Sequence, residues 1–334
     1  MMKLTLMRDV SATVDVDWHS PIADAILAHW AHDDERAWFV RSSANVLFGF
    51  KQDGRDCFLR FNHATERTPQ MIQFELDYLA YLQAAGLRVV QPIRSLAGNF
   101  IESVDTGLGQ FHAVAFERVS GEMLDISTLT PAQVAAWGRT LGELHQAVVG
   151  YNAVGRLTWR DQIESLEQDL PTHESAARQA AQLLHSQLAQ LPINTYQVKD
   201  NYGLIHFDFE LDNLLWDSER FGIVDFDDCI WHWHVADIAF ALRDLFDDDP
   251  AQVDLQNPTF KAFIGGYRQA KALPQEDLDQ IPLFLHLHNL VAFAKLLRAM
   301  DAGDAADDPT WLKDLRQRLA RKVDRYRARF ADEI

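Results

Sequence analysis

Three polar side chains fall within one short β-rich stretch of the chain, residues 204–226. Asp208 is followed by Asn213, and a second acid, Asp225, lies further along the same stretch. Transfer of a phosphoryl group to an alcohol needs a group that accepts the hydroxyl proton and oxygen ligands that hold a divalent cation on the phosphates. A carboxylate suits the first role, and an amide with a second carboxylate suits the second. These residues therefore indicate Asp208 as the base and Asn213 and Asp225 as magnesium ligands.

The residues around these side chains predict the strands that would hold them. Apolar runs that end in polar residues place His206 and Asp208 at a strand end, with Asn213 in the loop that follows. Residues 214–216 and 221–224 predict a β-hairpin directly after that loop, with Asp225 at its end. The alternative is an ordinary hairpin with surface acids and a buried histidine.

The N-terminal part of the chain predicts an antiparallel sheet with one packed helix. Strands are expected at residues 45–50, 57–61, 89–95 and 111–119. One helix should run from Thr68-Pro69 to Gly86, and a shorter helix should begin at Ser20-Pro21 with the serine as its cap. Apart from the β-rich stretch, the pattern beyond residue 118 is mainly helical, including residues 131–148 and 284–300.

The pattern His206-x-Asp208-x-x-x-x-Asn213, followed by Asp225-Phe226-Asp227, resembles the signature of aminoglycoside, choline, homoserine and methylthioribose kinases. The resemblance implies an α+β, bilobal, protein-kinase-like fold: a small antiparallel-sheet lobe with one packed helix and a larger, mainly helical lobe. The expected nucleotide-binding lobe is residues 1–118, and the expected catalytic and substrate-binding lobe is residues 119–334. The resemblance also implies a kinase that uses ATP and Mg²⁺ to phosphorylate a hydroxyl group of a small molecule.

The resemblance extends to residues that would bind the nucleotide. Arg60, at the close of a strand, occupies the position of the usual phosphate-binding lysine, and Glu75 matches the helix residue that pairs with it. Backbone groups of Glu117 and Val119 match the linker that binds adenine.

The chain departs from the family at two positions and in one loop. Arginine in place of lysine at residue 60 keeps the charge but differs in shape and in the number of donors. Phe207 stands where the family commonly has glycine, and residues 42–45 replace a Gly-x-Gly-x-x-Gly loop over the phosphates.

Composition restricts the partners and the compartment. The 334 residues carry a net charge of -18, which disfavours nucleic acid as a partner, because phosphate backbones are bound by clustered Lys and Arg. The two cysteines, Cys57 and Cys229, have no disulfide or zinc spacing, and residues 1–17 lack the apolar core of a signal peptide. With no stretch that we expect to span a membrane, these features predict a cytoplasmic protein. The sequence leaves the oligomeric state open.

The acceptor is expected to be a small hydroxyl compound that carries a positive charge. An acidic run that includes Asp244, Asp247, Asp248 and Asp249 follows the expected helix at residues 237–242, in the part of the fold that would line the acceptor site. The alternative is a solvated helix end.

Two other functions compete with a small-molecule kinase. One is a nucleotide-binding scaffold or pseudokinase of the same fold, which the intact Asp208, Asn213 and Asp225 set disfavours. The other is a protein kinase, which the lack of an activation segment after Asp225 disfavours. A metal site at residues 231–234, Trp-His-Trp-His, is the lesser alternative to packing there.

Overall fold

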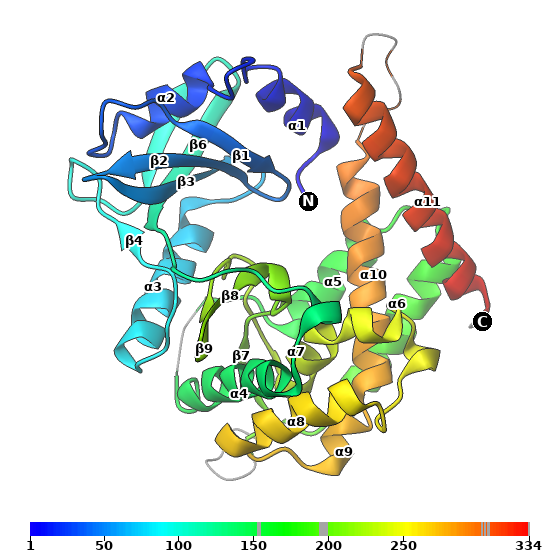
Figure 1. Ribbon diagram of the computed structural model, residues 1–334. Helices are drawn as coiled ribbons and strands as arrows, with labels where there is room; N and C mark the ends of the chain where they lie inside the picture. The colour runs from blue at the N-terminus through cyan, green and yellow to red at the C-terminus, as the bar shows by residue number, and fades with distance from the viewer. Residues whose placement is uncertain (152–154, 194–199, 302, 304, 306–307, 333–334) are drawn as a thin grey trace. The chain divides into compact units, whose positions relative to one another are not determined.

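The computed structural model describes residues 1–334 except 152–154, 194–199, 302, 304, 306–307 and 333–334. The chain forms two compact units, each built from segments that are far apart in sequence (Figure 1). Unit 1 comprises Met1–Asp77, Val90–Arg118 and Lys295–Arg325, and unit 2 comprises Tyr78–Val89, Val119–Ala294 and Tyr326–Ile334. The expected division into residues 1–118 and 119–334 stays a prediction, and the chain does pass from unit 1 to unit 2 after Arg118.

Unit 1 is built on a six-stranded antiparallel sheet. The strands follow the order β1-β2-β3-β6-β4 in space, and β5 pairs with β6. The elements of this unit are α1 (Leu4–Ser11), α2 (Pro21–Leu27), β1 (Trp38–Ser42), β2 (Val46–Gln52), β3 (Arg55–His63), the first part of α3 (Pro69–Ala84), β4 (Pro92–Ile93), β5 (Glu102–Thr106), β6 (Gly109–Glu117), the end of α10 (Ile281–Ala299) and most of α11 (Thr310–Asp332).

Alternation along β3 sends neighbouring side chains to opposite faces of this sheet. Phe61 stacks on Phe48 of β2 with ring centroids 5.8 Å apart, and it meets Phe111 of β6 edge-on at 5.5 Å. Successive strand residues face opposite sides, so Arg60 lies on the other face, where it pairs with Glu75 of α3. The two-residue alternation of β3 therefore places Phe61 in the aromatic core and directs Arg60 toward α3.

Unit 2 is mainly helical, with two small antiparallel sheets, β7 with β10 and β8 with β9. Its elements are the end of α3, η1 (Ile126–Thr128), α4 (Pro131–Ala147), α5 (Trp159–Asp169), α6 (Ser175–Leu188), β7 (Tyr202–Ile205), η2 (Leu211–Asn213), β8 (Leu214–Asp217), β9 (Arg220–Ile223), β10 (Ile230–Trp233), α7 (His234–Ala241), η3 (Arg243–Phe246), η4 (Pro250–Gln252), α8 (Pro258–Ala270), α9 (Gln275–Leu278), most of α10 and the end of α11.

Helices α4 and α8 pack with their backbones in direct contact. A Cβ atom added to Gly138 would stand 1.9 Å from the carbonyl oxygen of Phe263, and one added to Gly266 would stand 1.8 Å from that of Ala135. Only glycine allows such an approach, so this helix pair is a closely packed wall of unit 2.

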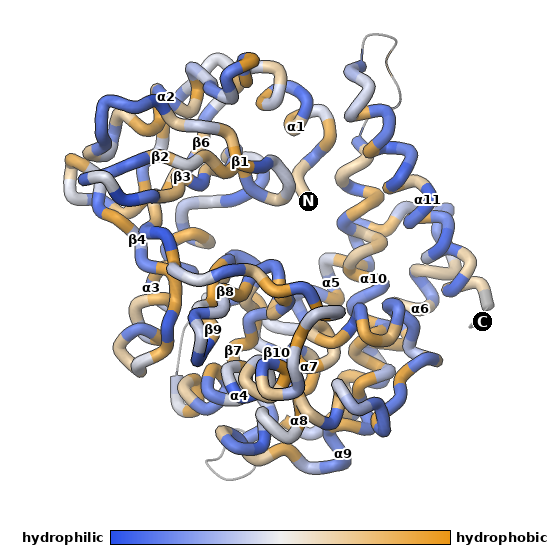
Figure 2. Tube along the Cα trace, viewed as in Figure 1, coloured by the Kyte–Doolittle hydropathy of each residue, from blue (hydrophilic) through white to orange (hydrophobic). Residues whose placement is uncertain are grey.

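Helix α10 is the most apolar long helix of the described chain. Figure 2 shows apolar residues along much of α10, whereas α11 is largely hydrophilic. The stretch Gln275–Ala299 is long and apolar enough to cross a membrane by length and composition alone. Within an apolar part of 18 residues, 56% is buried inside the protein, as in the core helix of a folded domain.

Most of the expected elements are present, with shifted ends. The helix at Thr68-Pro69 is α3, and Gly86 follows it with the left-handed φ of +89° that favours glycine at a helix end. The strand expected at residues 89–95 is wrong in length, since only Pro92–Ile93 forms a strand there. Ser20 precedes α2, but its hydroxyl contacts Thr13 Oγ1 at 2.7 Å instead of capping the helix. The sequence analysis missed α1, β1, β5 and β10.

Candidate active site

The loop after β7 and the hairpin β8–β9 bring Asp208, Asn213 and Asp225 together. The Asn213 side-chain amide donates to the Asp208 carbonyl at 2.9 Å and to its Oδ2 at 3.2 Å. The backbone N–H of Val224 donates to the Asn213 carbonyl at 3.0 Å, which holds Asp225 next to Asn213. The expected hairpin is present, and it positions these three side chains from one short stretch of chain.

The backbone of this loop is left-handed at two residues. Phe207 has a φ of +76° and Asp225 a φ of +64°. A bulky residue in this region is strained, which explains why a glycine would suit position 207. Phe207 keeps the conformation because its ring is buried, with 5% exposed, and packs on Phe240 of α7 at 4.9 Å.

A buried carboxylate in α7 holds the backbone of the loop in place. Asp237 accepts hydrogen bonds from the N–H groups of His206 and Phe207, both at 2.8 Å. It also contacts His145 Nε2 at 3.1 Å, and His145 Nδ1 lies 2.9 Å from the Tyr267 hydroxyl. Sequence reasoning assigned no role to Asp237, although an acid within the apolar helix α7, His234–Ala241, was a signal that it must have buried partners.

Burial determines the protonation states of Asp237 and His145. Burial raises the pKa of Asp237 to about 6, and the N–H groups of His206 and Phe207 oppose that rise because they stabilise the anion. Burial also holds the pKa of His145 well below its ordinary value. At neutral pH the contact is therefore a neutral imidazole donating to a carboxylate.

One arginine, Arg243 at the start of η3, faces the candidate base. Its guanidinium donates to the Glu210 carboxylate, and its Nη1 lies 3.6 Å from Asp208 Oδ1. Asp244 and Asp248 stand further out, with oxygens 4.0 and 3.9 Å from Nε. The side chain of Arg243 is 14% exposed and that of Asp208 is 41% exposed. Sequence analysis identified neither Arg243 nor Glu210 as part of the site.

This group of residues, the Arg243 cluster, has more negative than positive groups. Burial raises the pKa of Glu210 to about 7, and repulsion from Asp208 adds to the rise while Arg243 opposes it. The single guanidinium therefore does not keep all its neighbouring carboxylates ionised, and Glu210 titrates near neutral pH.

The acidic run predicted to recognise the acceptor divides into different environments. Asp244 has a 70% exposed side chain at the edge of the Arg243 cluster. Asp247 is exposed, with a φ of +53°, and Asp249 caps η4 by accepting from the Ala251 N–H. Asp248 is 21% exposed and closer to Arg243.

In unit 1, Arg60 and Glu75 form a closed pair. Nη1 and Nη2 of Arg60 donate to the two Glu75 oxygens at 2.8 and 2.5 Å, with side-chain exposures of 8% and 2%. The guanidinium lies 5.0 Å from the ring centroid of Phe116. The sequence predicted both partners. The structure brings them together because Arg60 lies on the face of β3 that is turned toward α3, and the helical period of α3 places Glu75 opposite it.

The expected adenine linker follows β6 directly. Glu117 ends β6, and its N–H donates to the Gln91 carbonyl at 2.9 Å. The chain continues through Val119 to Gly121, whose φ of +113° lets the backbone approach the Trp216 carbonyl. The loop at residues 43–45 joins β1 to β2, and the backbone N–H of Met2 donates to the Ser43 carbonyl at 2.9 Å.

The histidines of residues 231–234 lie in the core of unit 2. His232 and His234 are at most 2% exposed, and His234 stacks on His145 with ring centroids 4.4 Å apart. Within the described part of the chain, no group of three or more His, Cys, Asp or Glu side chains has an arrangement suited to a metal ion. A metal at Asn213 and Asp225 would therefore need further ligands from phosphates and water.

Comparisons with known proteins place the chain in a family. The model of the phosphotransferase enzyme family matches residues 35–273. Amicoumacin kinase of Bacillus subtilis (strain 168) is 26% identical over 317 residues, which cover 90% of this chain and 92% of the relative.

Two solved structures share the fold over nearly the whole chain. The amicoumacin kinase hAmiN, in complex with AMP-PNP, Ca²⁺ and Ami, has a TM-score of 0.78 at 24% identity and covers 97% of this chain and 96% of its own. The microcompartment-associated aminopropanol kinase has a TM-score of 0.70 at 25% identity, with coverages of 92% and 94%. The resemblance and the α+β, protein-kinase-like fold predicted from the sequence are confirmed. The chain belongs to the phosphotransferase enzyme family and is a small-molecule kinase of that family.

Proposed function

We propose that this protein uses ATP and Mg²⁺ to phosphorylate a hydroxyl group of a small acceptor that carries a positive charge. The observation that carries the proposal is the arrangement of Asp208, Asn213 and Asp225 beside the Arg243 cluster: Asn213 donates to Asp208, and its carbonyl accepts from the N–H of Val224, which precedes Asp225. We place the activity in the cytoplasm, since the chain has only two cysteines, Cys57 and Cys229, whose spacing in the sequence indicates no disulfide framework.

Asp208 is proposed as the base that orients and deprotonates the acceptor hydroxyl. Its carboxylate is partly exposed, so an acceptor can reach it, and the Asn213 amide fixes the position of Oδ2. Asp237 acts through the backbone, because it holds the residues that precede Asp208. This support keeps the base in place without touching the reacting atoms.

Asn213 and Asp225 are proposed to hold the metal. The Asn213 amide nitrogen donates to Asp208, which leaves the amide oxygen as its metal-binding atom. One amide oxygen and one carboxylate form the type of incomplete oxygen set that Mg²⁺ accepts, with phosphate and water ligands completing the shell. When bound, the ion would neutralise charge on the phosphates.

The nucleotide is proposed to contact residues near the closed pair and the linker. Glu75 fixes the Arg60 guanidinium, whose N–H groups not used in that pair would steady the phosphates. The Glu117 N–H is already bonded to Gln91, so adenine would use the Glu117 carbonyl and the Val119 N–H.

The charge of the acceptor follows from the Arg243 cluster. The Arg243 guanidinium faces the carboxylates of Asp208, Glu210, Asp244 and Asp248. Arg329 of α11 donates to the backbone carbonyls of Asp247 and Asp248, and the carboxylates around the base still outnumber the two guanidinium groups. A negative site attracts an ammonium group and disfavours anionic acceptors. One structural relative is named for aminopropanol, an amino alcohol whose amine is protonated at neutral pH.

A matched pair of acceptors tests the proposal. We expect 1-amino-2-propanol and related amino alcohols to release ADP from magnesium ATP, and the neutral 1,2-propanediol to do so at least tenfold less efficiently in kcat/KM. Phosphorus NMR of the product should show a phosphate ester. Equal use of neutral acceptors would remove the charge assignment. Magnesium ATP that raises the melting temperature without ADP release on any of a broad set of alcohols would favour a nucleotide-binding scaffold.

A further inference from the structure

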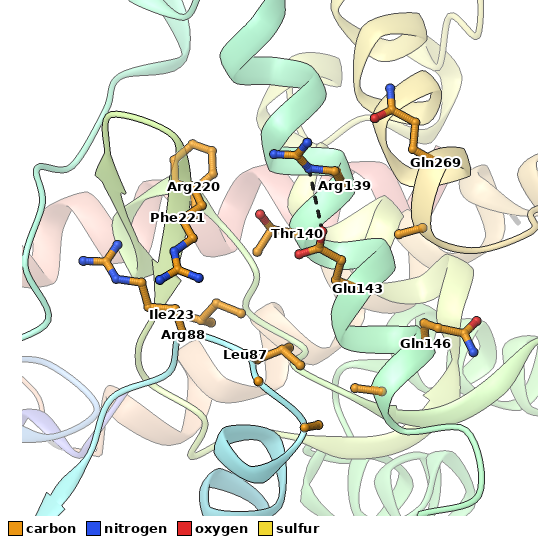
Figure 3. A pocket seen from close by; sticks show the side chains of 14 residues that line it. Leu87, Arg88, Arg139, Thr140, Glu143, Gln146, Arg220, Phe221, Ile223 and Gln269 are labelled. Atoms are coloured by element: carbon orange, nitrogen blue, oxygen red, sulfur yellow. Dashed lines mark ion pairs between the residues drawn. The ribbon is translucent and has the colours of Figure 1, made fainter.

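A cavity in unit 2 lies between α4 and the hairpin β8–β9. Its volume is about 560 Å³, within the range of pockets that bind small molecules. Figure 3 shows Arg139, Thr140 and Glu143 of α4 on one side and Arg220 and Phe221 of β9 on the other. None of Asp208, Asn213 and Asp225 lines it.

The cavity is positive in a protein that is strongly negative. Arg88, Arg139 and Arg220 line it, and Glu143 is the one acid in its wall, whereas the whole chain has a net charge of -18. Such a local excess of guanidinium groups favours an anion.

The three arginines differ in the hydrogen bonds and ion pairs that they already form within the protein. Arg88 is bound to the Ser120 carbonyl at 2.6 Å and pairs with Asp217 at 3.2 Å. Arg139 stands 3.7 Å from Glu143, and both side chains are about half exposed, which makes a weak pair. Arg220 is exposed and forms no ion pair within the described ranges of the chain.

The walls of the cavity are well supported. On one side, Arg139 projects from α4, which packs backbone to backbone on α8. On the other side, Phe221 is 2% exposed and packs on Trp216 with ring centroids 4.9 Å apart. Partly exposed apolar residues complete the lining, among them Leu87 and Ala147. A ligand in this cavity would therefore contact both guanidinium groups and apolar side chains.

We propose that this cavity is a second binding site, which takes a small organic anion with a phosphate or carboxylate group on an apolar body. The guanidinium groups of Arg139 and Arg220 would bind the anionic group, and Leu87 and Ala147 would contact the body. A ligand held by both arginines links α4 to the hairpin β8–β9, whose two ends carry Asn213 and Asp225. The binding site itself does not depend on the proposed reaction, because its lining residues take no part in that chemistry.

Phenyl phosphate, inorganic phosphate and benzoate test the site with the nucleotide-free protein at constant ionic strength. We expect each to raise the melting temperature, and phenyl phosphate to act at a lower concentration than inorganic phosphate because of the apolar lining. The double variant Arg139→Gln/Arg220→Gln should need at least tenfold more phenyl phosphate for the same shift. A residual response in that variant reports anion binding elsewhere, including the nucleotide site.

The matched control is Arg318→Gln/Arg321→Gln, which removes two exposed arginines of α11 and the same total charge. It should respond like the unchanged protein. Equal responses in all three proteins would overturn the proposal, and so would equal losses in both variants, which would reflect net charge alone.

X-ray crystallography of the unchanged protein tests the site even if the double variant folds poorly. Crystals of the unchanged protein soaked in selenate should show an anomalous peak between Arg139 and Arg220. Peaks confined to other places would overturn the proposal, as would a cavity without a peak at a selenate concentration that labels other sites.

Discussion

Each of the two units contains an arginine that binds carboxylates, and the two arrangements differ in charge balance. In unit 1, Arg60 donates two hydrogen bonds to the Glu75 carboxylate, and both side chains are buried. In unit 2, Arg243 is shared between Glu210 and Asp208, with further acids at its edge. The first is a closed pair held by two hydrogen bonds, and the second is an open cluster with excess negative charge.

The difference separates two roles for the same type of contact. A closed pair holds both of its side chains in one geometry and so fixes the groups around it. An open cluster attracts a cation, and one of its members, Glu210, titrates near neutral pH. We therefore expect changes in the closed pair to act mainly on stability and changes in the open cluster to act on turnover and acceptor binding.

The largest effect is expected from Asp208→Asn in the open cluster. Loss of the base should lower kcat for ADP release by a factor of about 100 to 10,000 while magnesium ATP still binds. Kinetics with a saturating acceptor and the thermal shift produced by magnesium ATP measure the two properties separately. Asp225→Asn is the comparison, since loss of a metal ligand should weaken nucleotide binding. Equal loss of nucleotide affinity in both variants would contradict the assigned roles.

Glu75→Gln tests the closed pair. It removes the carboxylate charge that faces the buried Arg60 guanidinium and should lower the free energy of unfolding by about 3 kcal/mol, or the melting temperature by roughly 10 °C. Glu210→Gln is the matched change in the open cluster, and it should cost much less, because Glu210 is already half protonated near pH 7 and Arg243 keeps Asp208. Thermal melting at pH 7 compares the two variants. Similar destabilisation would show that both arginines form closed pairs.

The sequence predicted the members of the site that local pattern determines. Arg60 follows from its place in a strand, Glu75 from the helical period, and Asp208, Asn213 and Asp225 from one short stretch with a hairpin. Each of these residues is positioned by the element in which it lies. The family, the fold and the kinase activity followed from this stretch and are confirmed.

The residues that surround the base could not be predicted in this way. Arg243 and Asp237 reach Asp208 and His206 from later segments, so their contacts depend on how α7 and η3 pack against β7. Strand β5, Glu102–Thr106, was missed because its polar residues hide the strand pattern, although pairing with β6 stabilises it. Long-range packing decided these features.

The titration of Glu210 predicts a pH step in acceptor binding. Above about pH 7 the group is ionised, so KM for a cationic acceptor should fall as the pH rises through this value, while KM for ATP should change little. Glu210→Gln should lose this step. Kinetics from pH 6 to 8.5 with an amino alcohol, and with a neutral acceptor as control, measure it. The same step in the variant would assign the titration to another group.

The same pKa has a consequence for stability. Burial and repulsion from Asp208 raise it from 4.5 to about 7 in the folded protein, so the folded state holds this proton more tightly than the unfolded state. The contribution to stability is therefore largest below about pH 4.5, falls as the pH rises to about 7 and is constant above that value. Unfolding at several pH values should show this fall in the unchanged protein and less of it in Glu210→Gln.

The smallest effect is expected at the exposed edge of the open cluster, from Asp244→Asn. Its carboxylate is 70% exposed and 4.0 Å from Arg243, so its attraction for a cationic acceptor should be worth about 0.2–1 kcal/mol, which raises KM by a factor of about 1.4 to 5. Asp247→Asn is the matched control, because Asp247 belongs to the same acidic run but its carboxylate forms no ion pair in the described part of the chain; Arg329 contacts only its backbone carbonyl, and asparagine tolerates its φ of +53°. The ratio of the two KM values should approach one as salt is added, since added salt shortens the range of the attraction. Equal effects of the two variants would show that the whole acidic run acts through net charge, and the distinction between a closed pair and an open cluster would then not extend to acceptor recognition.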